Sequence, residues 1–381
     1  MFSKNSCIYL DSSATSRYKP RAVIKRVEKE LKNSANAGRG GHRAAMRALE
    51  TIEECRERIE SVTFPGNVIM TKSCTEAVNL AVFGARYGGE IITSVYEHNA
   101  VLRPLEKLKK SGVVVRYLTS PDGVITPDLL KRNLNKKVSL VALSEMSNVT
   151  GTVQPIDELG SLLADYGIPF LVDGAQSLGH TYSKYTGVTM IAGAGHKSLH
   201  GPQGTGFLCY RKEYKLSPIL FGGTGTNSLS LIQPDEPPEG FEAGTLNTAG
   251  IGGLSEGIRW TEKRKADIVA HAEKLSAKLI DGLKSVGGVK IYSNNLNGVI
   301  SFNIADLPST AVADVLDSDF GIATRAGIHC APLIHRWLGT LSQGAVRASI
   351  GCKNTLSDID RLVLAVREIA VKNAKGEYRI R

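Results

Sequence analysis

The 381-residue sequence lacks any apolar run that approaches the roughly 18–20 residues needed to cross a membrane. Its first residues, MFSKNSCIYLDSSAT, lack the apolar core of a secretory signal peptide. Internal repeats and low-complexity linkers are also absent. We therefore expect a cytoplasmic protein with no membrane partner.

Cysteine is scarce and scattered, with no CxxC pair and no matched histidine spacing. The pattern predicts neither a disulfide framework nor a metal site. Five of the six cysteines are expected to be free thiols in a reducing compartment, and the sixth, Cys330, has a separate role below. The six are Cys7, Cys55, Cys74, Cys209, Cys330 and Cys352.

Nucleotide-binding signatures are missing, because the chain has neither a Walker A motif nor a GxGxxG. The net charge is 47 − 37 = +10, but the basic residues are dispersed and form no aromatic-interleaved face. We expect a solvated basic surface and no nucleic-acid partner; attraction of anionic substrates or partners is the alternative. With 42% hydrophobic and 22% charged residues, the composition is that of a soluble globular protein.

Short apolar runs alternate with amphipathic stretches from about residue 67 to 210. This alternation predicts an α/β fold with a mostly parallel sheet covered on both faces. Such sheets bind ligands beyond the carboxyl ends of their strands. The apolar runs are VIMT (68–71), EIITS (90–94), VSLVALS (138–144), IPFLVD (168–173), VTMIAG (188–193) and GFLCY (206–210).

The pattern changes after about residue 250, which predicts a large domain over 1–255 and a smaller α+β domain over 256–381. One long helix is expected over 256–286, and a final amphipathic helix near Ser357. The first 14 or so residues are expected to pack on the small domain. Its predicted strands are VISFNIA (299–305), GIATRAG (321–327) and AVRASIG (345–351).

Two residues suggest a pyridoxal 5′-phosphate (PLP) site. Lys197, in AGAGHKSLHGPQGTG, follows a strand-like run among small residues that allow a flat ligand to approach. A lone lysine in such a place is usually only solvated. Asp173 ends the apolar run IPFLVD, where a carboxylate needs a partner such as a pyridinium nitrogen. A turn cap is the other interpretation of Asp173.

Three further segments follow predicted strands. In MTKSCTEAVN (70–79), backbone N–H groups and the Ser73 and Thr75 hydroxyls can hold a phosphate at a helix N-terminus, although both are ordinary capping residues. His98, in YEHNAV, could lie over a cofactor ring or be a core histidine. Asn148, in SNVTG, could bond a ring hydroxyl or belong to a turn.

At these residues the sequence resembles the class V aminotransferase fold, and within it the cysteine desulfurase/selenocysteine lyase branch of the SufS type. The resemblance extends from YLDSSAT (9–15) to the last helix. It implies a PLP-dependent transferase of fold type I, with a large domain and a smaller C-terminal one. The motifs NAGRGGH and HCAPLIHRWLGTLSQGAVR are closer still to a subgroup described as cysteine desulfurase family proteins. The motifs that carry the wider resemblance are SCTEAVN, EHN, SNVTG, VDGAQ, GHKSLHGPQGTG, FEAGTLNT and RAGIHCAP.

The resemblance implies a role for each residue of the cofactor site. Lys197 would bond PLP covalently and later shuttle the Cα proton. Asp173 would pair with the ring nitrogen, and His98 would stack on the ring as a catalytic residue. The other implied contacts are to the ring oxygen from Asn148 and Gln176, and to the phosphate from Cys74, Thr75 and His196.

Thr245, in EAGTLNT, would reach the phosphate of a neighbouring subunit, which implies a homodimer. One departure concerns Ala194, which stands where the family usually has Ser or Thr. One phosphate contact is therefore missing or replaced.

Cys330, in ATRAGIHCAP, has Arg325 and His329 nearby, and cations favour the nucleophilic thiolate. Its position matches the sulfur acceptor of the family. Arg347 matches the arginine that clamps the substrate carboxylate with a bidentate fork. Arg325 and Asn148 complete the implied substrate contacts.

Asn36, Arg39 and His42 match an entry-side loop to which the sequence assigns no role.

The function implied is a PLP-dependent cysteine desulfurase that converts L-cysteine to L-alanine through a Cys330 persulfide and passes sulfur to an acceptor protein, as in iron–sulfur cluster synthesis. Selenocysteine lyase is the alternative, using the same residues. An aminotransferase or epimerase of this fold is a further alternative, but those enzymes typically lack a cysteine at this position. A non-catalytic scaffold is disfavoured by the intact Lys197, Asp173, His98 and Arg347.

Overall fold

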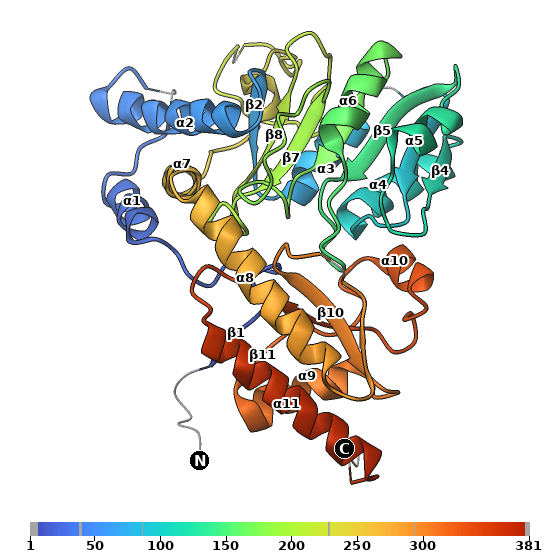
Figure 1. The fold of residues 1–381 in the computed structure, drawn as a ribbon. Helices are drawn as coiled ribbons and strands as arrows, with labels where there is room; N and C mark the ends of the chain where they lie inside the picture. Colours follow the sequence, from blue (N-terminus) through green and yellow to red (C-terminus); the bar gives the residue numbers. More distant parts are fainter. Residues whose placement is uncertain (1–6, 38–39, 86, 228, 294, 378–381) are drawn as a thin grey trace. The chain divides into compact units, whose positions relative to one another are not determined.

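The computed structural model describes residues 7–37, 40–85, 87–227, 229–293 and 295–377, which form two compact units (Figure 1). Unit 1 comprises the described residues of Met1–Tyr18, Met146–Val153 and Lys265–Arg381. Unit 2 comprises those of Lys19–Glu145 and Gln154–Arg264. The boundary expected between residues 255 and 256 stays a prediction. No helix in the described part of the chain is long and apolar enough to span a membrane.

Unit 2 is built on a seven-stranded sheet with the order β2-β8-β7-β6-β5-β3-β4. All neighbours are parallel except at β8, which runs antiparallel to both β2 and β7. The predicted α/β fold with a mostly parallel sheet is therefore confirmed. The strands are β2 (Asn67–Thr71), β3 (Glu90–Ser94), β4 (Val114–Leu118), β5 (Val138–Ser144), β6 (Phe170–Asp173), β7 (Met190–Ala194) and β8 (Gly206–Tyr210).

Crossover helices connect the parallel strands and cover the sheet, as βαβ units require. Ala77 and Val78 of α3 and Val101 and Leu105 of α4 belong to one apolar cluster with residues of the sheet. Thr126 caps α5 by accepting a hydrogen bond from the amide of Leu129. The crossover helices are α3 (Cys74–Gly84), α4 (Asn99–Lys110), α5 (Pro127–Asn133) and α6 (Ile156–Asp165).

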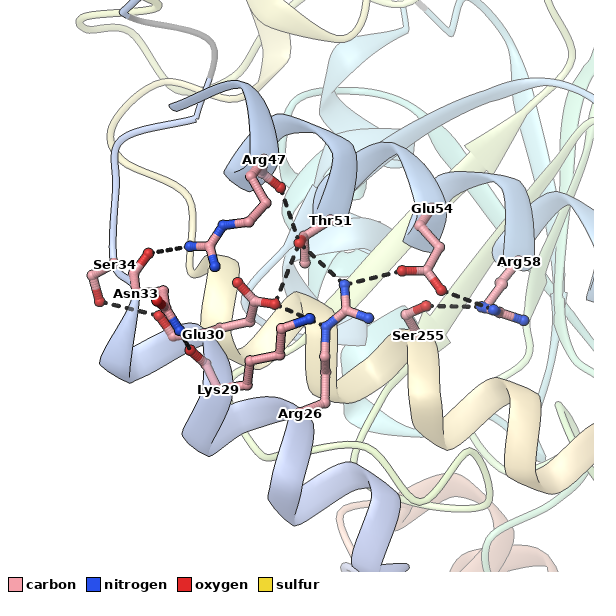
Figure 2. A network of polar contacts seen from close by, with 10 residues as sticks. All are labelled: Arg26, Lys29, Glu30, Asn33, Ser34, Arg47, Thr51, Glu54, Arg58 and Ser255. Carbon is pink, nitrogen blue, oxygen red and sulfur yellow. Dashed lines mark hydrogen bonds and ion pairs between the residues drawn. The ribbon is translucent and has the colours of Figure 1, made fainter. Parts of the chain in front are cut away.

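Three more helices of unit 2 are joined by a polar network, shown in Figure 2. They are α1 (Arg21–Lys32), α2 (Arg43–Val62) and α7 (Thr248–Glu262). Arg26 of α1 contacts Glu30 at 2.9 Å and Glu54 of α2 at 3.0 Å. Arg58 of α2 contacts Glu54 at 2.8 Å and the Ser255 hydroxyl of α7 at 2.9 Å. Because Glu30 is buried, this network fixes the helices more strongly than surface ion pairs would.

Unit 1 contains a three-stranded antiparallel sheet with the order β12-β10-β9. Helices α8, α9 and α11 contribute to one apolar core with this sheet. Near the start of the chain, β1 (Ile8–Tyr9) pairs in parallel with β11 (Ile322–Ala323). The remaining elements are α8 (Lys265–Lys284), β9 (Val289–Ile291), β10 (Val299–Ile304), α9 (Ser309–Phe320), α10 (Pro332–Trp337), β12 (Val346–Ser349) and α11 (Leu356–Ala374).

Two predicted elements of the second half are wrong in extent. The helix predicted over 256–286 is two helices, because α7 ends at Glu262 and α8 begins at Lys265. These helices bury their apolar faces in different units. The strand predicted over 321–327 is limited to Ile322–Ala323, with only an isolated bridge between Arg325 and Arg347 beyond it. Positive φ angles from Gly327 onward end the extended run.

A buried ion pair anchors the segment that leads to Thr245. Arg56 of α2 donates to both carboxylate oxygens of Glu242, at 2.9 and 2.7 Å, just after the 3₁₀ turn η1 (Glu239–Phe241). Glu242 also accepts the amide hydrogen of Met70 in β2 at 2.6 Å. The pair thus ties α2, β2 and the Thr245 segment together.

We predict that Glu242→Ala lowers the free energy of unfolding by about 3–5 kcal/mol, because it leaves the Arg56 guanidinium buried without its bidentate partner. Urea denaturation measures the effect. The matched control is Glu53→Ala, which removes the half-exposed partner that contacts Arg56 at 3.1 Å. It should change the unfolding free energy by roughly 0–1 kcal/mol. Equal effects of the two substitutions would contradict the greater contribution of the Arg56–Glu242 pair to stability.

Candidate functional site

Several of the predicted cofactor residues lie at the carboxyl edge of the unit 2 sheet. Residue 74 follows β2, His98 follows β3, Asp173 ends β6, and His196 and Lys197 follow β7. Because β8 runs in the opposite direction, its first residue, Gly206, lies at this same edge. The strand ends therefore bring together residues that are more than 120 positions apart in sequence.

Asp173 and Cys74 are buried beside each other, and the half-buried Lys197 is close enough for its charge to act on Cys74. The Asp173 carboxylate is only 5% exposed and accepts hydrogen bonds from the Ala175 amide at 2.9 Å and the Cys74 thiol at 3.3 Å. Burial raises the pKa of Cys74 well above its ordinary value; the Asp173 charge adds to this rise and the Lys197 charge opposes it. The thiol therefore stays protonated.

The N-terminus of α3 lies tightly against β8. Ser73 caps this 11-residue helix by accepting a hydrogen bond from the Glu76 amide. A Cβ at Gly206 would lie 2.4 Å from the Ser73 carbonyl carbon and 2.8 Å from the Cys74 nitrogen. Only glycine permits this approach, which holds the first α3 amides at the sheet edge, where an anion can bind.

His196 lies beside Lys197 in an electropositive setting. Burial, together with the charges of Lys197 and Lys19, lowers its pKa to about 4. The Lys19 ammonium donates to the His196 carbonyl at 3.2 Å. The neutral imidazole can donate one hydrogen bond to an anion. Ala194, at the end of β7, is buried in the apolar cluster that also contains Cys74.

The other predicted contacts of unit 2 vary in exposure. His98 caps α4 by accepting the amide hydrogen of Ala100 on Nδ1 at 3.0 Å, which fixes the orientation of its ring. Gln176 is buried, and its carbonyl accepts from the Ser198 hydroxyl at 3.3 Å. Thr75 and Thr245 are exposed.

Glu97 is a buried carboxylate that the sequence analysis missed. It precedes His98 and is 1% exposed. It accepts a hydrogen bond from the Ser94 hydroxyl, at the end of β3. It also accepts from the amide and hydroxyl of Ser144, at the end of β5, both at 2.6 Å. Burial raises the pKa of Glu97 to about 7, and nearby Asp173 adds to the rise. A carboxylate three residues after a predicted strand was the available signal.

Unit 1 places the predicted thiol beside a guanidinium. Cys330 is half-buried, and its sulfur lies 3.9 Å from Nη2 of Arg325. His329 and Cys330 both have positive φ angles, +48° and +55°. Non-glycine residues adopt this left-handed backbone only when their surroundings hold it. The thiol therefore stands on a strained turn.

Arg347 is the most deeply buried cation of the predicted set, at 1% exposure. Its Nη2 contacts Asp11 at 2.8 Å, and its Nη1 donates to the Asn148 carbonyl at 3.0 Å. The Asn148 amide donates in turn to the His329 carbonyl at 2.9 Å. Nε of Arg347 is buried without a hydrogen-bond partner among the described residues. The fork of Arg347 therefore keeps one donor for an anion.

The predicted entry-side loop is only partly described. His42 is exposed and caps α2 by accepting from the Ala45 amide at 3.3 Å, and Asn36 is exposed. Arg39 lies outside the described residues.

We predict that Glu97→Gln changes the dependence of stability on pH. The Glu97 pKa is raised in the folded state, so the carboxyl stabilises the fold while it is protonated. This contribution is lost as the pH rises from the ordinary value of about 4.5 to about 7. Between pH 5 and 8 the wild type should lose on the order of 2–3 kcal/mol of unfolding free energy relative to the variant.

Urea denaturation of both proteins at several pH values tests this, with Glu158→Gln, an exposed carboxylate of α6, as the control. If the difference in unfolding free energy between wild type and Glu97→Gln stays constant with pH, the pKa of the Glu97 carboxyl is not raised in the folded state.

Comparison with known proteins places the chain in a family. The model of the aminotransferase class-V family matches residues 8–362. Among curated proteins, a probable cysteine desulfurase of Methanothermobacter thermautotrophicus is 33% identical, with 95% of this chain and 94% of the relative covered. One from Pseudomonas aeruginosa is 35% identical, with 96% and 94% covered. The apo structure of a cysteine desulfurase from Thermococcus onnurineus superposes with a TM-score of 0.88 at 33% identity, covering 96% and 95%. The chain therefore belongs to the aminotransferase class-V family.

Proposed function

We propose that this protein is a PLP-dependent cysteine desulfurase, which converts L-cysteine to L-alanine and retains the sulfur on Cys330 as a persulfide. The observation that carries the proposal is the environment shared by Asp173, Cys74 and Lys197 at the carboxyl edge of the sheet. The naming of relatives at 33% and 35% identity as probable cysteine desulfurases supports the same reaction.

The polar groups of unit 2 fit PLP, which has a cationic ring nitrogen and a phosphate. The buried Asp173 carboxylate suits the ring nitrogen, because a charge at 5% exposure needs a charged partner. The α3 amides held by Gly206 and the neutral His196 suit the phosphate. When bound, PLP supplies an electron-withdrawing ring that stabilises the charge left on a substrate carbon.

The remaining cofactor contacts follow from the same assignment. His98 would cover one face of the ring, since the Ala100 amide already orients its imidazole. Gln176 and Asn148 would bond the ring oxygen, and Cys74 and Thr75 the phosphate. Lys197 would hold the cofactor and then move the substrate Cα proton. Ala194 brings no hydroxyl to the phosphate.

Arg347 is the group proposed to bind the substrate carboxylate. Its Nε–H is buried and lacks an acceptor, which costs about 1–3 kcal/mol in the absence of a ligand. A carboxylate that accepts from Nε recovers this cost through a charge-assisted hydrogen bond. Asp11 and the Asn148 carbonyl hold the guanidinium in place.

The sulfur transfer is written so that it balances. The thiolate of Cys330 attacks the substrate sulfur, so that an S–S bond forms and the substrate Cβ–S bond breaks. The electron pair of the broken bond stays on the substrate and is protonated, which gives alanine. In sum, one enzyme thiol and one L-cysteine give one enzyme persulfide and one L-alanine. The Arg325 guanidinium lies 3.9 Å from the Cys330 sulfur.

The persulfide must then pass its sulfur to an acceptor thiol or acceptor protein, and the cytoplasmic location expected from the sequence would keep such thiols reduced. A selenocysteine lyase would use the same residues. Assays with L-cysteine and L-selenocysteine side by side, measuring alanine with sulfide or selenide, distinguish the two activities.

We predict that Lys197→Ala abolishes alanine formation and the visible absorbance of the cofactor bound through this lysine. Cys330→Ala should keep that absorbance and abolish sulfide release from L-cysteine. The control is Cys352→Ala, the other half-buried thiol described in unit 1, which should retain full activity. Sulfide release at the wild-type rate by Cys330→Ala would exclude the persulfide mechanism.

We also propose that the enzyme acts as a homodimer in which Thr245 reaches the phosphate bound by the other subunit. Thr245 is exposed, as a residue with that role must be before association. The segment before it exposes large apolar side chains: Phe221 (73%), Leu229 (101%), Leu231 (105%) and Ile232 (81%). Apolar side chains gathered in one exposed segment typically mark an association surface.

We predict that the double substitution Leu231→Asp, Ile232→Asp yields a monomer that retains PLP poorly. Light scattering after size-exclusion chromatography and the visible absorbance measure the two effects. Leu364→Asp, an exposed position on α11, should remain dimeric. A wild-type monomer with fully bound PLP would overturn the proposed role of Thr245.

A further inference from the structure

The turn that carries Cys330 is held by a buried pair of histidines. The imidazole of His329 makes two contacts. Its Nε2 atom lies 3.3 Å from the Arg325 carbonyl oxygen, and its Nδ1 atom lies 3.3 Å from Nε2 of His335. The two rings are stacked, with centroids 5.4 Å apart. Nδ1 of His335 lies 2.8 Å from the Thr340 hydroxyl. His335 and Thr340 are buried, at 0% and 2% exposure.

The first contact fixes the direction of the whole series. A carbonyl only accepts, so Nε2 of His329 carries the proton, and in a neutral ring Nδ1 then accepts. His335 must therefore donate from Nε2, and its own Nδ1 accepts from the Thr340 hydroxyl. The hydrogen bonds run one way, from Thr340 through His335 and His329 to the Arg325 carbonyl.

This series meets the other contacts that hold the Cys330 turn. The backbone carbonyl of His329 accepts from the Asn148 amide at 2.9 Å. Arg325, whose carbonyl ends the series, also places its guanidinium 3.9 Å from the Cys330 sulfur. His329 is thus fixed at its ring and at its backbone, directly before a thiol in the left-handed backbone region.

We infer that His335 and Thr340 are positioning residues for sulfur transfer, because their hydrogen bonds orient His329 and so hold Cys330 in its strained turn. The inference rests on the proposed function of Cys330 as the sulfur acceptor. Among the described residues, the Cys330 sulfur has a hydrogen-bond contact with Arg325 and none with His335 or Thr340. Both residues therefore act through His329.

The electrostatic setting is consistent with neutral rings. Burial lowers the pKa of His329 to about 3, with the charges of Arg347 and Arg325 adding to the fall. Burial also lowers the pKa of His335 to about 4. A second proton on His329 would place two N–H groups face to face across the 3.3 Å contact with His335.

Matched substitutions at Thr340 test the inference without altering side-chain volume much. Thr340→Val removes the hydroxyl that donates to Nδ1 of His335, whereas Thr340→Ser keeps it. We expect Thr340→Val to lower the rate of sulfide release about 5–100-fold, the fold-change equivalent to one buried donor or acceptor left unpaired. Thr340→Ser should stay within about threefold of wild type.

A second pair varies His335 itself. His335→Gln keeps an N–H donor toward His329, whereas His335→Leu fills a similar volume without one. Sulfide release should fall for Leu and be largely rescued by Gln. The absorbance change on adding L-cysteine, which reports substrate binding in the Lys197 site, should be unchanged in all four variants. The rate at which iodoacetamide alkylates Cys330 should change only in Thr340→Val and His335→Leu.

Cys330→Ala separates the two hypotheses. If Cys330→Ala still releases sulfide, the proposed function fails on its own. If Cys330→Ala is inactive but Thr340→Val and His335→Leu match wild type in sulfide release and alkylation, the positioning inference fails. It fails equally if the absorbance change is lost together with sulfide release, because the substitutions would then act on the whole fold.

Discussion

The proposed chemistry depends on one constraint, which is that a carboxylate buried at the end of a parallel strand must find a cationic partner. The constraint applies to Asp173 at the carboxyl edge of the sheet. Its hydrogen bonds from the Cys74 thiol and the Ala175 amide come from neutral donors. A protonated pyridine ring would satisfy the carboxylate and would become a better electron acceptor in doing so. Lys197, whose charge is felt in the same environment, is the amine that such a ring would need.

Unit 1 meets a different physical requirement, since a thiol proposed to receive sulfur must stay accessible while its backbone is held in place. Cys330 is half-buried rather than enclosed, and its backbone lies in a region that side chains with a Cβ rarely adopt. Asn148 links this turn to Arg347, because its amide bonds the His329 carbonyl and its carbonyl accepts from the guanidinium. The same short segment therefore orients both the thiol turn and the proposed substrate clamp.

The sequence predicted the sheet well because buried strands are continuous apolar runs, and β3, β5 and β8 begin and end where EIITS, VSLVALS and GFLCY do. It failed at the junction of α7 and α8, since apolar periodicity continues while the two helices join different cores. Glu97 and Asp11 were missed for a related reason. Their importance comes from partners far away in sequence, such as Ser144 for Glu97 and Arg347 for Asp11, and no local pattern records such pairs.

In the proposed reaction, Cys330 receives the sulfur. The most direct measurement adds L-cysteine once to the purified enzyme without reductant and determines the masses of the cysteine-containing peptides together with the alanine formed. We predict one added sulfur atom on the peptide that contains Cys330, in proportion to the alanine. Alanine formed while that peptide remains unchanged, or sulfur found instead on Cys352 or Cys7, would contradict it.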